Sequence, residues 1–365
     1  MSGAIGAASY AGYGTMTSLI ADAQTVRQKL DQLTNQASTG LIAQTYAGLG
    51  SGASISLDLH PQLAAMQTWQ TNINAATGTM GVTQTAMTQL QSIASSFYAQ
   101  MDTLNGLNPS TVDTVAASAR QALVQVAGLL DTTDGNTYVF GGADSTNPPV
   151  PNPDGILTSG FYTQINTAVG GLSGAGAAAT AASTLAIASS NAAGTSPFSA
   201  YMSQPAATLQ AQIPQVQTGA GQTQSIGLLA SANTYVASTG SSTTGSYARD
   251  LMRALATVGS LSSSQVSATG FQGLVSDTYT SLGGVVTAMA QDAGVLGNQQ
   301  TALTAVGTQL TDQTTALTAQ VSPAENVDMA QTLSNLSLVQ TQLQSSYQLI
   351  SGQSALSLVK FLPVG

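Results

Sequence analysis

Charged side chains are scarce in this sequence of 365 residues. Only 6% of the residues are Asp, Glu, Lys or Arg, against roughly 25% in an average globular protein. The six basic residues are scattered along a chain whose net charge is −9. No basic cluster is therefore available to neutralise a nucleic-acid backbone or an anionic lipid surface. We expect neither nucleic acid nor a membrane surface as a partner.

Cysteine is absent, and histidine and glutamate occur once each, as His60 and Glu325. The lack of thiols excludes disulfides and thiolate chemistry, and a single histidine excludes a multi-histidine metal site within one chain. His60 precedes Pro61 at a predicted helix start, so we expect it to be structural or solvated. Asp131 and Asp134 lie beside a turn, where carboxylates typically accept backbone hydrogen bonds. No catalytic residue, cofactor or metal site is predicted, and the chain is not expected to be an enzyme.

Long apolar runs are missing as well. Residues 1–14 contain no basic residue and no continuous apolar core, so no secretory signal peptide is predicted. The best membrane candidate, residues 174–194, is rich in alanine and has only Leu185 and Ile187 as strongly apolar residues. This is too little for stable insertion in a bilayer. If the chain is exported, we expect another route.

Apolar residues do recur at helical spacing toward both ends of the chain, where they step by three and four. The first such seam ends at Gly40, and the second begins near Asp58 with Pro61 in the first turn of its helix. The first seam is Met16, Leu19, Ala23, Val26, Leu30, Leu33 and Ala37; the second is Met66, Trp69, Ile73, Ala76, Met80, Thr83, Met87, Leu90, Ala94, Phe97, Met101 and Leu104. Two long helices of coiled-coil type are predicted.

Further helices are predicted from capping signals. Ser110 and Asp113 form a capping box after Pro109, and Ser322 with Glu325 forms another around Pro323. The seam after Ser110 is Val112, Val115, Ala119, Ala122, Val126 and Leu129. A long seam before Ser322 is Val285, Met289, Leu296, Leu303, Val306, Leu310 and Leu317, interrupted by Asp292, Gln299 and Gln313; the last seam is Met329, Leu333, Leu336, Gln340, Leu343, Tyr347 and Ile350. Polar residues within a seam specify its register at some cost in stability.

The middle of the chain has a different composition. Asp134-Gly135-Asn136 is a turn signal, and residues 138–140 are a short strand candidate. No charged residue occurs from Gly155 to Ala248. This region could form a small β-rich domain, and its Ala/Gly tract at 170–194 could equally be a flexible excursion.

The predicted fold is mainly α, a long antiparallel coiled-coil-like helix bundle made from both chain ends, with a central β-rich or irregular inserted domain. Residues 1–45 and 323–365 are expected to be terminal coiled-coil assembly segments. Residues 46–140 and 247–322 are expected to form the long-helix bundle domain, and residues 141–246 the outward-facing insert. Because the terminal seams are narrow and rich in Ala, Thr and Gln, each isolated helix is expected to be marginal in water and to order on assembly.

Several segments resemble the flagellin superfamily, and within it most closely the hook-filament junction proteins, the hook-associated protein 3 type. Residues 33–40 look like the family's first helix end with its Gly stop, and residues 72–76 look like part of its second helix. Residues 138–142 are similar to the segment that leaves the helical domain. Residues 333–347 and the ending at 356–362 match junction proteins better than flagellins.

The resemblance implies a structural subunit that joins the hook to the filament of the bacterial flagellum by helical self-assembly. Two alternatives remain open: a flagellin of the filament, and a secreted adhesin with a helical stalk. The implied partners are copies of the chain, a hook-side junction protein, flagellin and an export chaperone. The implied location is extracellular, after export through the flagellar type III apparatus. The predicted assembly interface is Met16, Leu19, Val26, Leu30, Leu33, Met329, Leu333, Leu336, Leu343, Tyr347, Ile350 and Leu358.

Overall fold

The computed structural model describes residues 5–104 and 108–355, with side chains described between residues 17 and 352. Two compact units are present: unit 1 comprises residues 1–67 and 312–365, and unit 2 comprises residues 68–311. The elements, with η for a 3-10 helix, are α1 (Ile5–Thr39), η1 (Tyr46–Leu49), α2 (Gly52–Leu104), α3 (Pro109–Leu130), β1 (Thr133–Asp134), β2 (Thr137–Tyr138), η2 (Ile156–Thr158), α4 (Gly160–Gly170), α5 (Leu172–Ser189), α6 (Ala206–Ala211), β3 (Gln215–Gly219), β4 (Gln222–Ser225), α7 (Tyr247–Gly259), η3 (Ser263–Gln265), α8 (Phe271–Glu325) and α9 (Met329–Ala355). Helices α2 and α8 contribute to both units.

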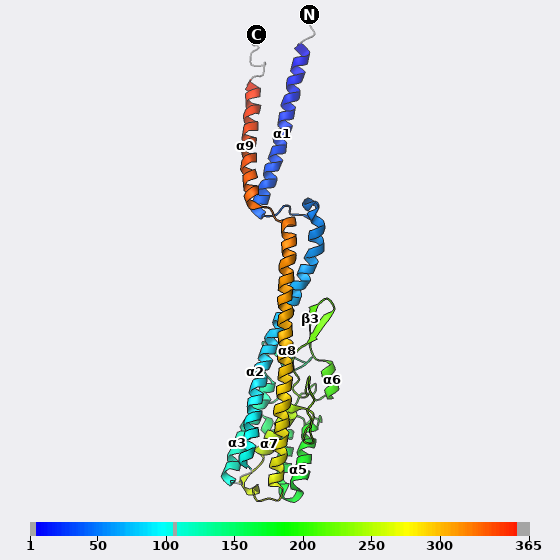
Figure 1. Cartoon of the computed structure of the whole chain (residues 1–365), viewed down its shortest axis with the longest axis vertical. Coiled ribbons are helices and arrows are strands. Elements are labelled where there is room, and N and C mark those ends of the chain that lie inside the picture. Colours follow the sequence, from blue (N-terminus) through cyan, green and yellow to red (C-terminus); the bar gives the residue numbers. More distant parts are fainter. Residues whose placement is uncertain (1–4, 105–107, 356–365) are drawn as a thin grey trace. The chain divides into compact units, whose positions relative to one another are not determined.

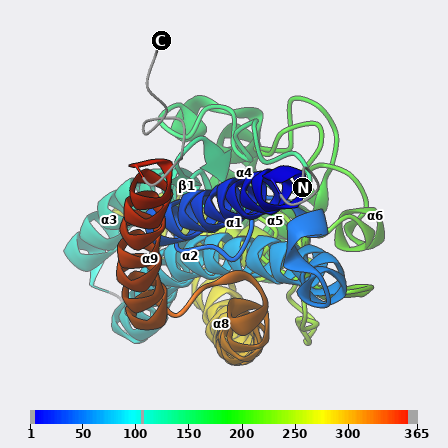
Figure 2. The same ribbon diagram turned by 90° about the horizontal axis from the view of Figure 1, so that it is seen from above.

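Unit 1 is built from the two ends of the chain. Helices α1 and α9 pack along each other in opposite directions (Figure 1), and the view from above again places α9 beside α1 (Figure 2). The beginning of α2 and the end of α8 complete this unit. The predicted pairing of the two chain ends in an antiparallel helical arrangement is confirmed.

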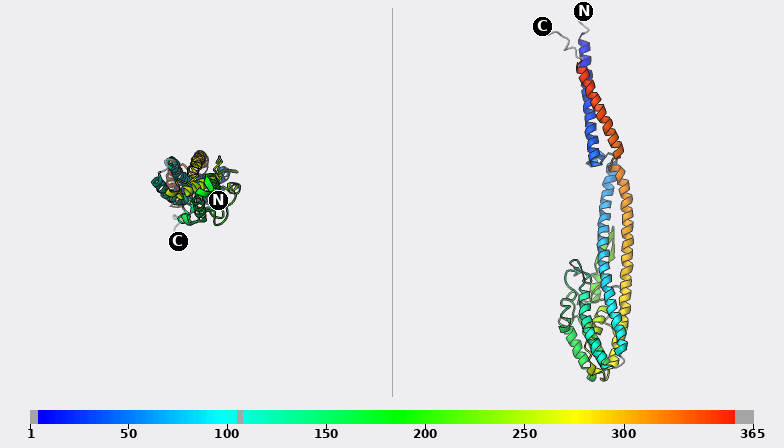
Figure 3. Two further views of the ribbon diagram at one scale, coloured as in Figure 1. Left: turned by 90° about the horizontal axis from the view of Figure 1, so that it is seen from below. Right: turned by 90° about the vertical axis from the view of Figure 1, so that its left-hand side faces the viewer.

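In unit 2, α2 and α8 run side by side (Figure 3). Gln70 Nε2 donates to Thr311 Oγ1 at 2.6 Å, and Gln300 Nε2 donates to the Thr77 carbonyl at 3.4 Å. The residue numbers rise along α2 while those of their partners fall along α8, so the two helices are antiparallel.

The predicted seams of α2 and α8 form much of the core of unit 2. The buried members on α2 are Ile73, Ala76, Met80, Thr83, Met87, Leu90, Ala94, Phe97, Met101 and Leu104, and on α8 they are Val285, Met289, Leu296, Leu303 and Leu310. Full burial of one such large apolar side chain contributes about 1.5–3 kcal/mol. The heptad reading of these two helices is confirmed.

Two helix starts differ from the sequence prediction. Helix α2 begins at Gly52 rather than near Asp58, so Pro61 lies inside the helix on an exposed turn. Helix α3 begins after Asn108, whose Oδ1 accepts a hydrogen bond from Ser110 N at 3.2 Å, with Pro109 in the first position. Ser110 is therefore not the N-cap, and Asp113 instead accepts a hydrogen bond from Ser263 N at 2.8 Å.

The last predicted helix start also differs. Helix α8 continues through Pro323 to Glu325, and α9 begins at Met329. Asp328 caps α9, because its Oδ1 accepts hydrogen bonds from Ala330 N at 2.9 Å and Gln331 N at 3.1 Å. The predicted capping box of Ser322 and Glu325 is wrong, since the Glu325 carboxylate is directed to α2.

The insert of unit 2 contains short helices and two small antiparallel hairpins. Strands β1 and β2 flank the predicted turn, with Gly135 at φ 60°, and β3 pairs with β4 from Gln215↔Ser225. Helices α4 and α5 pack on each other and on α7, every residue of which is buried. The predicted fold class, mainly α with a small strand-containing insert, is confirmed. The Ala/Gly tract forms α5 rather than a flexible excursion.

Hydroxyl groups on the helix surfaces bond their own helix. Thr34 Oγ1 donates to the carbonyl of Leu30 at 2.8 Å in α1, and Thr85 Oγ1 does the same to Gly81 at 2.9 Å in α2. Thr301 in α8 repeats this contact with the carbonyl four residues earlier. These helices therefore present a polar surface that carries few charges and whose hydroxyl protons already have an acceptor.

Within the described residues, α5 is long and apolar enough, by length and composition alone, to cross a membrane. Its Gly176 has φ 79° and interrupts the helix, which leaves a segment shorter than the roughly 20 residues needed to span a bilayer. Leu172, Thr180, Thr184 and Ala188 are buried inside unit 2. The other residues of α5 are half-buried or exposed, so the helix packs against unit 2 with one face.

Candidate functional site

The facing surfaces of α1 and α9 form a seam inside unit 1. On α1, Ala23 and Leu33 are buried. On α9, Thr332 and Val339 are buried, while Leu343 is half-buried. Further half-buried members are Leu19, Val26 and Leu30 on α1 and Leu336 and Ile350 on α9. The spacing of three and four on both helices is that of a coiled coil.

The predicted assembly residues divide into those in this seam and those outside it. Leu19, Val26, Leu30, Leu33, Leu336, Leu343 and Ile350 lie in the seam within the chain. Met329, Leu333 and Tyr347 are instead exposed, with exposed fractions of 41%, 52% and 49%. The side chain of Met16 and the whole of Leu358 lie outside the described residues.

On α1 and α9, sequence reasoning missed three large apolar side chains that are exposed. Leu338 and Leu349 on α9 are 66% and 63% exposed, and Ile20 on α1 is also exposed. Val339 was also missed, although it is buried in the seam. The signal in the sequence is the adjacent pair Leu338-Val339, which cannot face one partner because neighbouring helical residues point about 100° apart.

The exposed apolar residues of α9 form two stripes. Leu333 and Tyr347 are two heptads apart and lie on one flank of the seam, together with Met329. Leu338 and Leu349 are three turns apart and lie on the opposite flank. We call these the 333 flank and the 338 flank. Helix α9 therefore has three apolar directions, of which α1 covers one.

A short backbone bridge joins the segments that follow α1 and α8. Ile42 N donates to the Glu325 carbonyl at 2.6 Å, and Val327 N donates to the Gly40 carbonyl at 2.9 Å. Gly40 has φ 72°, a conformation that suits glycine at the end of a helix. Both helices of the terminal pair are thus tied to one backbone junction.

Glu325 and His60, the only glutamate and histidine of the sequence, pair with each other at this junction. His60 Nε2 lies 2.7 Å from Glu325 Oε1, and the buried Ser56 hydroxyl donates to the same oxygen. The hydrogen bond from Ser56 and the neighbouring His60 hold the pKa of Glu325 below its ordinary value. The prediction of a structural or solvated histidine agrees with a half-exposed imidazole whose Nε2 contacts the Glu325 carboxylate.

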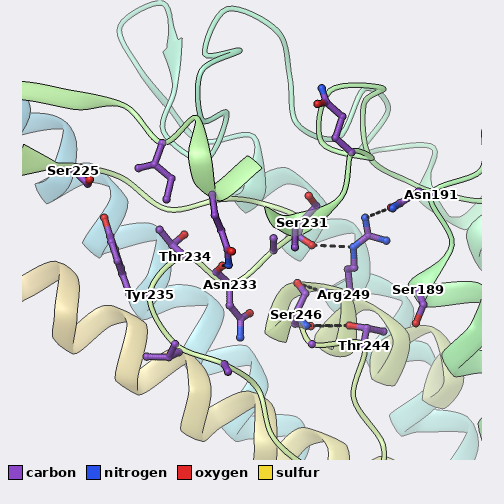
Figure 4. Close-up of a pocket in the computed structure, with 18 residues that line it drawn as sticks. Ser189, Asn191, Ser225, Ser231, Asn233, Thr234, Tyr235, Thr244, Ser246 and Arg249 are labelled. Carbon is purple, nitrogen blue, oxygen red and sulfur yellow. Dashed lines mark hydrogen bonds between the residues drawn. The ribbon is translucent and has the colours of Figure 1, made fainter. Parts of the chain in front are cut away.

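Unit 2 contains a polar cleft of about 720 Å³ beside Arg249 (Figure 4). Arg249 Nε donates to the Ser231 carbonyl at 2.9 Å, and Nη2 donates to Asn191 Oδ1 at 2.7 Å. Its Nη1 donates to the Ala188 carbonyl at 3.0 Å, and burial lowers the pKa of this guanidinium to about 10. The remaining lining is uncharged. Arg249 therefore ties the end of α5 to α7 and the loop at Ser231, and the cleft offers no acid-base pair.

Asp292 attaches the insert to α8. This carboxylate is fully buried, and it accepts hydrogen bonds from three consecutive backbone N–H groups: Thr234 at 3.1 Å, Tyr235 at 3.0 Å and Val236 at 3.0 Å. Burial raises its pKa, although these hydrogen bonds oppose the rise. Gln299, one heptad later, accepts a hydrogen bond on its carbonyl from Gln224. Of the three polar interruptions predicted to fix the register of α8, Asp292 attaches the insert through its side chain and Gln299 through its backbone carbonyl, whereas Gln313 is exposed.

The two aspartates near the β1–β2 turn bond to protein groups. Asp131 Oδ1 accepts a hydrogen bond from Val150 N at 2.8 Å, and Asp134 Oδ2 accepts one from Thr79 Oγ1 at 2.7 Å. Partial burial raises the pKa of Asp131 to about 6 from an ordinary 3.8. Among the described residues no group of three His, Cys, Asp or Glu could hold a metal ion.

The raised pKa of Asp131 predicts a pH-dependent stability. Between pH 3.8 and about 6 the folded chain binds this proton more tightly than the unfolded chain, so the unfolding free energy falls as the pH rises through this window. Asp131→Asn keeps an acceptor for Val150 N and removes the charge. We expect the variant to be more stable than the parent by about 1–2 kcal/mol at pH 8, after allowance for solvent screening. At pH 3.5 the two should be equal.

Urea denaturation at the two pH values measures this difference. The exposed Asp154→Asn is the matched control, and its effect should be the same at pH 3.5 and pH 8. An Asp131→Asn effect that does not change with pH would contradict the assignment.

Comparison with known families identifies both ends of the chain. A model of the bacterial flagellin N-terminal helical region matches residues 14–143, and a model of the C-terminal helical region matches residues 280–362. No curated protein matches the chain. The matched segments cover more than half of the sequence and contain α2, α3, α9 and most of α1 and α8, while the middle is unmatched. The chain therefore belongs to the flagellin superfamily, whose exported, non-enzymatic subunits polymerise into the extracellular flagellar filament.

Proposed function

We propose that this chain joins the hook to the filament of the flagellum, as a ring of copies that assemble through the terminal helices. The proposal rests chiefly on the two apolar flanks of α9. Leu333 and Tyr347 on one side, and Leu338 and Leu349 on the other, are about half or more exposed in the isolated chain. Exposed apolar stripes of this kind are typical of surfaces that another helix covers.

The seam and the flanks have different roles in this proposal. Leu343 and Leu30 hold α1 and α9 together within one subunit, and the flanks contact neighbouring subunits. Because the flanks lie on opposite sides of the seam, one subunit has two different neighbours. Contacts of this head-to-tail kind generate rings or open helical arrays. The terminal segments 1–45 and 323–365 are the assembly segments of this proposal.

The choice between a junction subunit and a filament subunit depends on the resemblance of residues 333–347 and 356–362 to junction proteins. The second of these segments lies outside the described residues. The family matches at both chain ends support a filament flagellin equally. A junction subunit has a hook-side junction protein and flagellin as its neighbours, together with copies of itself. Export through the flagellar type III apparatus, with a chaperone, belongs to the same proposal.

Abundance distinguishes these functions, because a filament needs thousands of copies and a junction only about a ring of them. We expect quantitative mass spectrometry to find the chain as a trace component of sheared flagella and enriched where the hook meets the filament. A dominant filament component would make it a flagellin. Absence from both would favour the adhesin, and unaltered filaments in a deletion strain would contradict the junction role.

A further inference from the structure

Two tyrosine rings are stacked between α2 and α8 in unit 2. Tyr98 lies on α2 and Tyr279 on α8, and their ring centroids are 4.4 Å apart with an angle of 18° between the ring planes. Both side chains are half-buried, so small solutes can reach the pair. Nearly parallel tyrosine rings at this distance are stacked in contact with each other.

The side chains of the two tyrosines also affect each other's titration. The interaction with Tyr98, together with burial and the charges of Tyr98 and Asp102, raises the pKa of Tyr279 to about 12. Because the ring planes are nearly parallel at this centroid distance, the two phenol rings face each other.

Gly283, one turn after Tyr279, allows this close approach. A Cβ built at Gly283 would lie 3.2 Å from Cε2 of Tyr98, one of the two ortho carbons. That distance is shorter than ordinary van der Waals contact, so a side chain at this position would displace the Tyr98 ring from α8.

We propose that Tyr98 and Tyr279 are a site of oxidative cross-linking, where a peroxide-driven one-electron oxidant converts the stacked pair into an intrachain dityrosine. Each phenol loses one electron and one proton to give a tyrosyl radical. One ortho carbon of each ring joins the other in a C–C bond, and the hydrogen on each of these carbons moves as a proton to the oxygen of its own ring, which restores both phenols. Per cross-link, the chain loses two hydrogen atoms in all and one hydrogen peroxide is reduced to two waters. Holding the two reacting rings face to face favours this coupling over reaction with a distant partner.

The product links α2 to α8 covalently in the body of the subunit. Because the linked residues are far apart in sequence, the bond restricts the unfolded chain strongly, as a long-range disulfide does. The cross-linked subunit is therefore expected to unfold at a higher urea concentration than the untreated one.

The test treats the purified full chain with hydrogen peroxide and a haem peroxidase. We expect a monomer that is lighter by two hydrogen atoms, that has dityrosine fluorescence, and whose digest contains one linked peptide pair with Tyr98 and Tyr279. Tyr98→Phe and Tyr279→Phe should each lower the yield of intrachain cross-link about tenfold or more. Tyr138→Phe, a half-buried tyrosine elsewhere in unit 2, is the matched control and should keep the parental yield.

A second pair of variants changes the geometry and keeps both tyrosines. Gly283→Leu should lower the yield, whereas Gly294→Leu, at an open position on the same helix, should not. Far-ultraviolet circular dichroism identifies variants that fail to fold, and these are replaced by Gly283→Ala and Gly294→Ala. Cross-links only between chains, a linked pair of other tyrosines, or an undiminished yield in Tyr279→Phe would each overturn the proposal.

Discussion

Asp292→Ala is expected to lower the unfolding free energy by about 3–5 kcal/mol, because it leaves three N–H groups, one buried and two partly buried, without an acceptor. Those groups belong to Thr234, Tyr235 and Val236, and each lies about 3 Å from a carboxylate oxygen of Asp292. Water cannot replace the carboxylate readily, since Asp292 is fully buried. Chemical denaturation followed by circular dichroism measures the loss.

Two further substitutions make this test specific. Asp292→Asn keeps one carbonyl oxygen, which can serve Tyr235 and Val236, and should cost only about 1–2 kcal/mol. Asp312→Ala removes an exposed aspartate from the same helix and should change stability by no more than about 0.5 kcal/mol. Equal effects at Asp292 and Asp312 would mean that the loop 234–236 is not held by this carboxylate.

Leu343→Asp is expected to abolish assembly while unit 2 stays folded. Leu343 is half-buried in the seam between α1 and α9, and a carboxylate there would face apolar side chains. Helix α9 carries no Lys or Arg, and Arg27 and Lys29 of α1 are exposed outside the seam. An unpaired charge at an apolar contact costs several kcal/mol, which the narrow seam cannot offset. Leu30→Asp on α1 should have the same effect.

Motility and electron microscopy of cells that carry each variant measure assembly, and circular dichroism of the purified chain reports on unit 2. Thr341→Asp adds the same charge at an exposed position on the side of α9 opposite the seam, away from both flanks, and should leave cells motile. Leu333→Asp distinguishes the role of the flank from that of the seam, because it should block assembly while α1 and α9 stay packed together. Normal motility with Leu343→Asp would refute the seam assignment.

Sequence periodicity identified the core of unit 2 well and the surface of α9 only in part. From Ile73 to Leu104, α2 buries a single face, so one heptad seam describes it. Helix α9 has apolar residues in three directions, and the sequence alone cannot tell which of them the same chain covers. The heptad chosen for α9 therefore combined Leu343, in the seam, with Leu333 and Tyr347, on a flank.

Helix ends were predicted less well because two capping signals competed at each. Asn108 and Ser110 can both cap α3, and Ser322 and Asp328 can both cap a helix near the chain end. The contacts that decide between them come from distant parts of the sequence. The Asp113 carboxylate is hydrogen-bonded to Ser263, and the Glu325 carboxylate is hydrogen-bonded to Ser56 and His60, so neither caps its own helix. Local spacing contains no information about such partners.

The insert was the least predictable region because it lacks charges and strong periodicity. Its Ala/Gly tract is helical in α5 since α4 and α7 supply the surfaces against which it packs. The residue that attaches the insert, Asp292, was visible in the sequence as an interruption of a seam. The groups that it binds could not be predicted, because every residue except proline has a backbone N–H and the sequence does not distinguish the three that bind Asp292.

The hydroxyls that bond their own helices affect what happens when a neighbour covers them. Thr301 and Thr341 donate to carbonyls of α8 and α9, so covering these side chains leaves no hydroxyl proton without an acceptor. A neighbouring helix that shifts along such a surface meets equivalent, already satisfied groups at each turn. The register between the two helices must then be fixed by the few large apolar side chains. The hydroxyl-bearing surface between those side chains allows one helix to slide along the other.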